Sequence, residues 1–135
     1  LRQKVADAIQ AGDHAATFGA NPVACAAALQ VFGKLNSDGF MEELKEKGDY
    51  LRTRLEKLMQ RFPEDIVEIR GRGLIAGAVT TRPAGDFLVP FRERDILVAT
   101  AGANVVRFLP PLIVEQERID EVVDVFDEIL RQGVE

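Results

Sequence analysis

Thr17 is one of two residues in this 135-residue chain whose type and setting could bind an anion. It lies in a loop of mostly small residues, 15–20, directly before Asn21-Pro22. Asparagine caps helices and proline fits the first helical position, so this pair predicts a helix start. Anions often bind at helix N-termini, but Pro22 lacks an N–H and Asn21 competes for another. An anion would therefore use the Thr17 hydroxyl and the loop backbone; a purely structural loop is the alternative.

Arg107 is the second candidate, because it interrupts the apolar run over residues 105–111. A charge in such a strand is costly unless it is paired. The planar guanidinium of arginine suits a carboxylate or a phosphate. From spacing alone, two other interpretations stay open: a strand position that alternates to the solvent face, or an internal ion pair.

The remaining reactive residue types give weaker signals. His14 is the only histidine, which excludes a multi-histidine metal site within this chain and makes a structural or solvated role the expectation. Ser37 is the only serine and lies in a turn cluster, which disfavours a Ser-His-Asp triad. Cys25 cannot form an intramolecular disulfide, and its alanine-rich surroundings predict a small buried hydrophobe. The segment 71–73 does not match a phosphate-binding loop, and turn geometry explains it better.

Composition limits the partners. The chain is 47% hydrophobic and 29% charged, and its formal net charge is −5. Its length suggests one domain, and its acidic balance gives no support to nucleic-acid binding. No stretch approaches the roughly 18–20 apolar residues of a membrane span. No signal peptide is apparent at the N-terminus, so we expect a cytoplasmic protein.

Apolar spacing marks the helices that must position the two candidates. We predict helices over residues 1–11, 22–35, 40–62 and 115–131, and a kinked or two-part helix over 82–94 because Pro90 interrupts it. The helix over 22–35 is alanine-rich, so we expect it to pack closely at the centre of the fold. In the helix over 40–62, Gly48 weakens the prediction by about 1 kcal/mol relative to alanine. The basic residues expected to face water in that helix are Arg52, Arg54, Lys57 and Arg61.

Strands are predicted over residues 66–70, 74–80, 96–100 and 105–109, with turns at 71–73 and 101–104. Asp95 stands where a glycine would normally end the preceding helix, and aspartate tolerates the left-handed conformation. Short strands joined by turns favour an antiparallel sheet. The predicted fold class is therefore α/β of the α+β kind: N-terminal helices lead into a small, mostly antiparallel sheet with helices packed on one face.

Three strings resemble the class III aminotransferases of the ornithine/acetylornithine type, which use pyridoxal phosphate. They are Gly-Asp-His-x-x-Thr-Phe-Gly-x-Asn-Pro over residues 12–22, Arg-Gly-Arg-Gly-Leu-Ile-Ala-Gly over 70–77, and Val-Arg-Phe-Leu-Pro-Pro-Leu over 106–112. They occur in the family's order at compatible spacing, and the resemblance extends over essentially the whole chain.

This resemblance implies roles for both candidates. Thr17 would bind the cofactor phosphate across the interface of a homodimer, and Arg107 would hold a carboxylate of a small-molecule substrate. The implied reaction transfers an amino group from an N-acetylornithine-like donor to 2-oxoglutarate. Residues 1–35 would be the end of the large cofactor domain and a connecting helix, and residues 36–135 would be the C-terminal small domain of a fold-type I enzyme.

The chain also departs from the family pattern. Ala16 stands where serine or threonine is common, Ala15 and Ala20 stand where glycine is common, and Pro90 and Asp95 depart from the usual helix and glycine stop. The Schiff-base lysine of the family lies upstream of residue 1, so we expect no catalytic residue here and an inactive isolated chain. None of the lysines matches a catalytic position: Lys4, Lys34, Lys45, Lys47 and Lys57.

Two other classes of function remain open at this point. A small antiparallel sheet with helices on one face also serves as a free-standing regulatory module that binds small molecules. The apolar helix over 22–35 could instead act in dimerisation, because large exposed apolar patches bind partners. The string around Thr17 separates these classes, since a regulatory module has no need for it.

Overall fold

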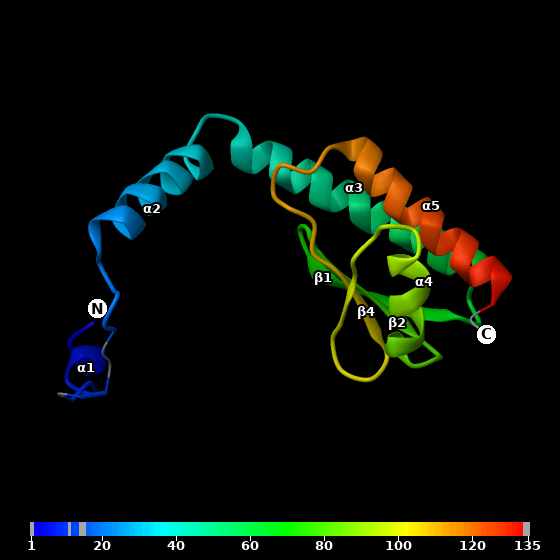
Figure 1. Cartoon of the computed structure of the whole chain (residues 1–135), viewed down its shortest axis with the longest axis horizontal. Helices are drawn as coiled ribbons and strands as arrows, with labels where there is room; N and C mark the ends of the chain where they lie inside the picture. Colours follow the sequence, from blue (N-terminus) through cyan, green and yellow to red (C-terminus); the bar gives the residue numbers. More distant parts are fainter. Residues whose placement is uncertain (1, 11, 14–15, 134–135) are drawn as a thin grey trace. The chain divides into compact units, whose positions relative to one another are not determined.

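The computed structural model describes residues 2–10, 12–13 and 16–133, and divides the chain into two compact units, residues 1–38 and 39–135. The first unit holds helices α1 (Gln3–Ala6) and α2 (Pro22–Leu35), at the blue and cyan end of the sequence in Figure 1. The prediction of a helix over 1–11 is wrong in extent. The backbone N–H of Gln10 donates to the carboxylate of Asp13 at 2.8 Å, so a loop forms after α1.

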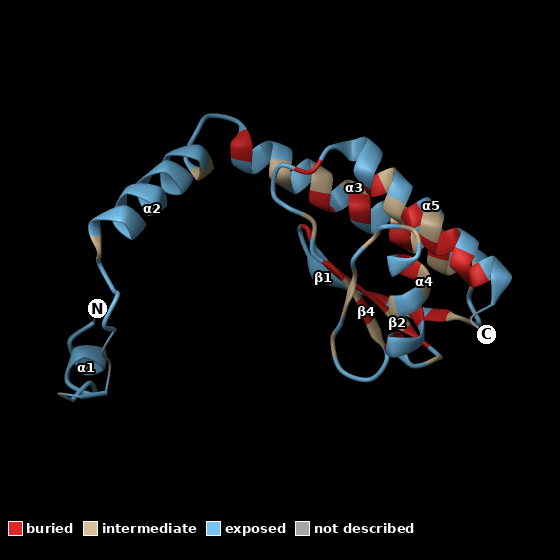
Figure 2. Cartoon of the chain, viewed as in Figure 1, coloured by how far each residue is buried: buried red, intermediate tan, exposed pale blue. Residues whose placement is uncertain are grey.

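Helix α2 begins as its sequence predicts. The side chain of Asn21 accepts a hydrogen bond from the N–H of Ala24, with Pro22 in the first turn. However, none of its residues is buried, and Figure 2 shows the helix in pale blue throughout most of its length. The expectations of a central helix and of a buried Cys25 are therefore wrong for this chain. An apolar composition predicts that a helix packs against another surface, but it does not indicate whether that surface belongs to the same chain.

The second unit contains the sheet and its covering helices. In chain order its elements are α3 (Phe40–Arg61), β1 (Ile66–Arg72), β2 (Ile75–Thr80), η1 (Ala84–Phe87), α4 (Leu88–Arg92), β3 (Ala99–Thr100), β4 (Val105–Phe108) and α5 (Gln116–Gln132). The strands lie in the order β1-β2-β4-β3, and each neighbouring pair is antiparallel. This confirms the predicted small antiparallel sheet with helices.

The core lies between one face of this sheet and the helices. Helices α3 and α5 lie side by side, and their buried residues, red in Figure 2, alternate with exposed ones. At the centre, the ring of Phe126 from α5 contacts Phe87, Phe91 and Phe108 at centroid distances of 5.4–5.8 Å. These three partners come from η1, α4 and β4, so the cluster joins every layer of the unit.

Charged side chains connect α3 to α5 on the solvent side of the core. Arg54 contacts Asp120 at 2.7 Å and Asp124 at 2.6 Å, and Arg61 pairs with Asp127. The expectation that Arg54 faces water is wrong, because it is half-buried, whereas Lys57 is exposed as predicted. Sequence periodicity identified the apolar stripe of α3 but not the acidic face of the helix beside it.

Three local predictions concern the helix around Pro90, the strand over 96–100 and the turn at 71–73. The two-part helix around Pro90 is confirmed as η1 followed by α4, and Asp95 has the left-handed φ of 58°. The strand predicted over 96–100 pairs only at Ala99–Thr100, and Leu97 is 86% exposed. The turn predicted at 71–73 is wrong in place. Strand β1 continues through Arg72, and the chain reverses at Gly73 and Leu74.

Candidate functional site

The sheet places Arg107 between two small residues, Gly77 and Ala99, in a row that crosses all four strands. Arg70, Gly77, Arg107 and Ala99 are successive partners across β1, β2, β4 and β3. Gly77 has no side chain, and a Cβ atom there would lie 2.7 Å from the Cγ1 of Val105. Gly77 therefore adds no side chain above β2, between the side chains of Arg70 and Arg107.

Arg107 lies on the sheet face that points away from the helices. Its neighbours along β4, Val106 and Phe108, are buried in the core, and side chains alternate along a strand. Arg107 itself is half-buried. Its Nε atom is buried and has no hydrogen-bond partner. Within the ranges that the structure describes, no ion pair to Arg107 is found, so a donor of this group is left for a bound acceptor.

Other charged residues share this outer face. Glu68 and Arg70 stand two residues apart on β1, and their side chains form an ion pair at 2.7 Å. The hydrogen bond from Arg70 holds the pKa of Glu68 below its ordinary value, and the same bond raises the pKa of Arg70. Both side chains are at least half exposed, so solvent screens this pair.

Reciprocal hydrogen bonds between Thr80 and Asn104 hold the start of β4 against the end of β2. The N–H of Thr80 donates to the carbonyl of Asn104 at 2.7 Å, and the Asn104 side chain donates back to the Thr80 carbonyl at 3.3 Å. The Thr80 hydroxyl lies 2.8 Å from the Arg82 carbonyl, and Thr80 is only 2% exposed. These residues position the strand that carries Arg107. Sequence reasoning missed them, although a threonine at a strand end before a turn offers a faint signal.

Thr17 lies in the exposed turn that leads into α2. The amide of Asn21 donates to the Phe18 carbonyl at 2.7 Å, which ties the turn to the helix cap. Ala20 takes a positive φ of 56°, a conformation easier for the glycine common in the family pattern. His14 and Ala15 lie outside the described residues, so the predictions for them are not addressed.

Thr17 belongs to the first unit and Arg107 to the second, so each candidate is described within its own unit. Among the described residues, no group of three or more histidine, cysteine, aspartate or glutamate side chains could hold a metal ion. In the same residues, no helix is both long and apolar enough to cross a bilayer.

Comparison with known proteins decides the family. The model of the family described as aminotransferase class-III matches residues 1–130. The chain belongs to this family. An acetylornithine aminotransferase of Caldanaerobacter subterraneus subsp. tengcongensis is 42% identical to this class III aminotransferase chain over 122 residues, which are 90% of the chain and 31% of that protein. The chain thus spans about a third of its relatives' length.

Two further relatives agree with this assignment. A mitochondrial acetylornithine aminotransferase of Saccharomyces cerevisiae is 35% identical over 130 residues, covering 96% of this chain and 31% of that protein. An acetylornithine aminotransferase structure from Elizabethkingia anophelis matches with a TM-score of 0.81 and 25% identity over 96% of this chain and 33% of that chain. Because one relative is named mitochondrial, the cytoplasmic location of this chain stays a prediction.

Proposed function

We propose that this chain is the C-terminal part of an acetylornithine-type aminotransferase that transfers an amino group from N-acetylornithine, or a related ω-amino donor, to 2-oxoglutarate. Its membership of the class III family and the names of its relatives support the reaction class. The observation that carries the proposal is Arg107, half-buried on the outer sheet face with an Nε atom that lacks a partner. A buried guanidinium donor without a partner is costly unless a ligand supplies one.

Arg107 would hold the carboxylate of the amino acid or oxo acid. Guanidinium and carboxylate match in a planar, bidentate arrangement that fixes orientation as well as position. Gly77 and Ala99 on either side leave room for a ligand over the strand. In the complete enzyme, Arg107→Lys should raise KM for carboxylate substrates about tenfold or more, since charge-assisted hydrogen bonds contribute about 1.5–3 kcal/mol. An unchanged KM would refute this role.

Thr17 would bind the phosphate of pyridoxal phosphate. When bound, this cofactor supplies the electron sink for amino transfer. The residues present fit the phosphate end of the cofactor: an exposed hydroxyl in a turn before a helix N-terminus, with the cap already closed by Asn21. The hydroxyl would donate to a phosphate oxygen, while the Asn21 side chain keeps the turn in place.

The role of Thr17 can be tested by cofactor affinity. In the complete enzyme, Thr17→Ala should weaken pyridoxal phosphate binding, and Thr17→Ser should retain most of it because serine keeps the hydroxyl. Equilibrium dialysis followed by absorbance of the bound cofactor measures both. Equal affinities for the alanine and serine variants would contradict the assignment.

The proposal includes the division of the chain. Residues 1–35 would end the cofactor domain and residues 36–135 would form the small domain; the separation of two compact units near residue 38 supports this. Without the cofactor lysine, the purified 135-residue chain should be folded but show no transamination. Activity of that chain, free of host enzyme, would overturn the expectation.

Homodimerisation is the last part of the proposal. Four large apolar residues of α2 are 60–80% exposed: Val23, Leu29, Val31 and Phe32. Exposed apolar surface of this kind favours association. The isolated chain should therefore self-associate in sedimentation velocity. Replacement of Leu29 and Phe32 by serine should shift it towards the monomer, and a parent chain that stays monomeric at high concentration would argue against this surface.

A further inference from the structure

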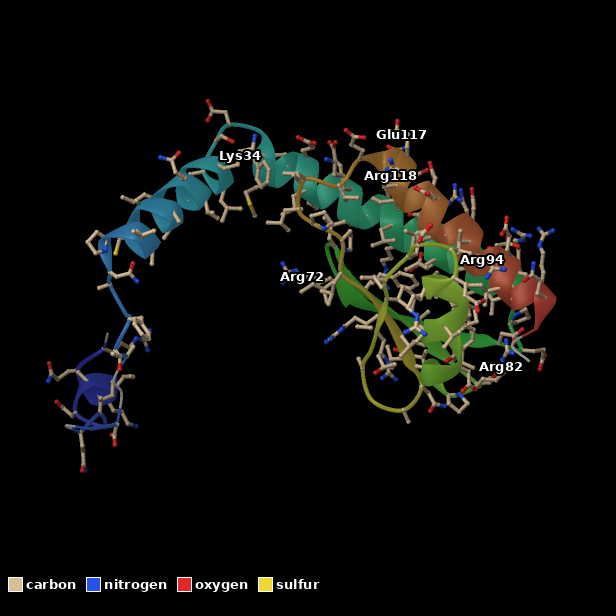
Figure 3. The ribbon with its side chains drawn as sticks, in the orientation of Figure 1. Lys34, Arg72, Arg82, Arg94, Glu117 and Arg118 are labelled. Atoms are coloured by element: carbon tan, nitrogen blue, oxygen red, sulfur yellow. The ribbon has the colours of Figure 1, made fainter. Side chains whose placement is uncertain are left out.

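The connection between α2 and α3 carries a pair of residues that can react with each other. Asp38 is the only aspartate in the sequence that precedes a glycine, Gly39, and both residues are exposed. Lys34, labelled in Figure 3, lies in the last turn of α2, and α3 begins at Phe40. The pair therefore lies in a short exposed connection, the kind of segment in which covalent changes to a chain concentrate.

An aspartate before a glycine can react with its own backbone. The nitrogen of Gly39 attacks the side-chain carboxyl carbon of Asp38, a new C–N bond closes a cyclic succinimide, and the carboxyl hydroxyl leaves with the amide proton as water. Water then opens the ring. Opening at the side-chain carbonyl restores aspartate, whereas opening at the main-chain carbonyl breaks the original peptide bond and leaves isoaspartate. The chain then runs through the former side chain, and no co-reactant besides water takes part.

Neither reacting group of this pair is held by a hydrogen bond. Within the residues that the structure describes, no partner is found for the carboxylate of Asp38 or for the N–H of Gly39. The bond that begins α3 uses the Gly39 carbonyl instead, which accepts from the N–H of Glu43 at 3.0 Å. A Cβ atom at Gly39 would meet nothing within 4 Å, so the space around this residue is open. The Asp38 side chain can therefore turn toward the nitrogen without breaking another interaction.

Asn36 and Ser37, in the same connection, form a second pair that can close such a ring, and they provide an internal comparison. Here the nitrogen is held. The N–H of Ser37 donates to the Lys34 carbonyl at 3.2 Å, and the Ser37 hydroxyl donates to the same carbonyl at 2.7 Å. Turning this nitrogen toward the Asn36 side chain would break these bonds and cost their free energy. The structure thus favours reaction at Asp38 over reaction at Asn36.

We propose that Asp38 is a site of spontaneous isomerisation to isoaspartate in the folded chain. The product adds a methylene carbon to the main chain between α2 and α3 and leaves a free α-carboxylate in the exposed connection. Methyltransferases that act on isoaspartyl residues use such a carboxylate as the acceptor of a methyl group from S-adenosylmethionine. The modification rests on the local geometry of this connection and is independent of the catalytic function proposed above.

Peptide mapping of the purified chain, after prolonged incubation at neutral pH, tests the proposal. Trypsin releases residues 35–45, which contain both pairs. Isomerisation at Asp38 splits this peptide into two species of equal mass, whereas deamidation at Asn36 raises its mass. In the folded chain the equal-mass species should accumulate first. In a synthetic peptide of the same residues Asn36 should react first, because the amide nitrogen of asparagine is the better leaving group and nothing holds the Ser37 N–H.

Asp38→Glu is the matched variant, because it keeps the charge of an exposed residue and only enlarges the ring that must close. It should lose the equal-mass species and most of the methylation that an isoaspartyl methyltransferase and labelled S-adenosylmethionine give with the incubated chain. Asn36→Gln should retain both signals. The proposal is wrong if Asn36 reacts before Asp38 in the folded chain, as it should in the peptide, or if Asp38→Glu leaves the methylation unchanged.

Discussion

Gly48→Ala should destabilise the second unit, although alanine is normally better than glycine inside a helix. Gly48 is buried in the middle of α3, facing the β1–β2 hairpin. A Cβ atom at this position would lie 2.5 Å from the Cα and 2.8 Å from the carbonyl carbon of Gly73. These are backbone atoms, so no change of rotamer can make room. The helix and the hairpin would have to separate.

The expected magnitude follows from two opposing effects. Carbon atoms in contact prefer about 3.5–4.0 Å, so the clash demands a separation of about 1 Å along this contact. Overpacking of this kind costs about 1–3 kcal/mol. Higher helix propensity returns about 1 kcal/mol. The difference is a net loss of about 0–2 kcal/mol in the free energy of unfolding, and we expect the upper end of this range because the clashing atoms belong to the backbone.

Urea unfolding of the 135-residue chain, followed by circular dichroism, measures this loss. Two glycines provide controls, since a Cβ atom at Gly33 in α2 or at Gly85 in η1 would meet nothing within 4 Å. Gly85→Ala should be neutral or slightly stabilising, and Gly33→Ala should raise the helix content of α2. If Gly48→Ala is as stable as the parent chain, the close approach of Gly48 to Gly73 does not hold, and the reasoning fails.

Three further predictions concern the core and its charges. Phe126→Ala should cost about 3–5 kcal/mol in urea unfolding, because its ring is fully buried, whereas Phe32→Ala should cost little in the monomeric chain since that residue is 64% exposed. Asp127→Asn should lower the free energy of unfolding by about 1–2 kcal/mol, because Asp127 is only 8% exposed and accepts from two arginines. The carboxyl of Glu68 should titrate by NMR below its ordinary pKa, so any stabilisation it gives is present above the unfolded-state pKa and lost as the pH falls through the folded one. Arg70→Gln should restore the ordinary value, and an unchanged midpoint would contradict the pair.

The sequence predicted those elements whose apolar period is long and regular. Helices α3 and α5 are the clearest cases, since apolar residues recur at helical spacing along the buried face of each. The predictions were less accurate where pairing decides the outcome. Nothing in the run Ile96-Leu97-Val98 distinguishes a strand from the unpaired segment observed, because only a neighbouring strand could make the difference.

The candidate site was predictable in part for the same reason. Arg107 could be singled out because a charge in an apolar strand is unusual. Its neighbours could not, since the Glu68–Arg70 pair depends on the path of β1 and the Thr80–Asn104 hydrogen bonds join residues that lie 24 positions apart in the chain. The buried position expected for Cys25 was wrong, because composition cannot show whether a helix is covered within its own unit.

The two edges of the sheet bear on where aggregation of this chain can begin. Open strand edges invite pairing with other molecules, and proteins block them with short strands, bulges and charges. Here β3 has only two residues, and β1 carries a register shift between Ile66 and Glu68, followed by two arginines. Strand-by-strand growth into fibrils is therefore disfavoured at both edges. We expect aggregation of the isolated chain to start from the exposed apolar helix α2. Substitutions in α2 should therefore improve solubility more than substitutions in the sheet.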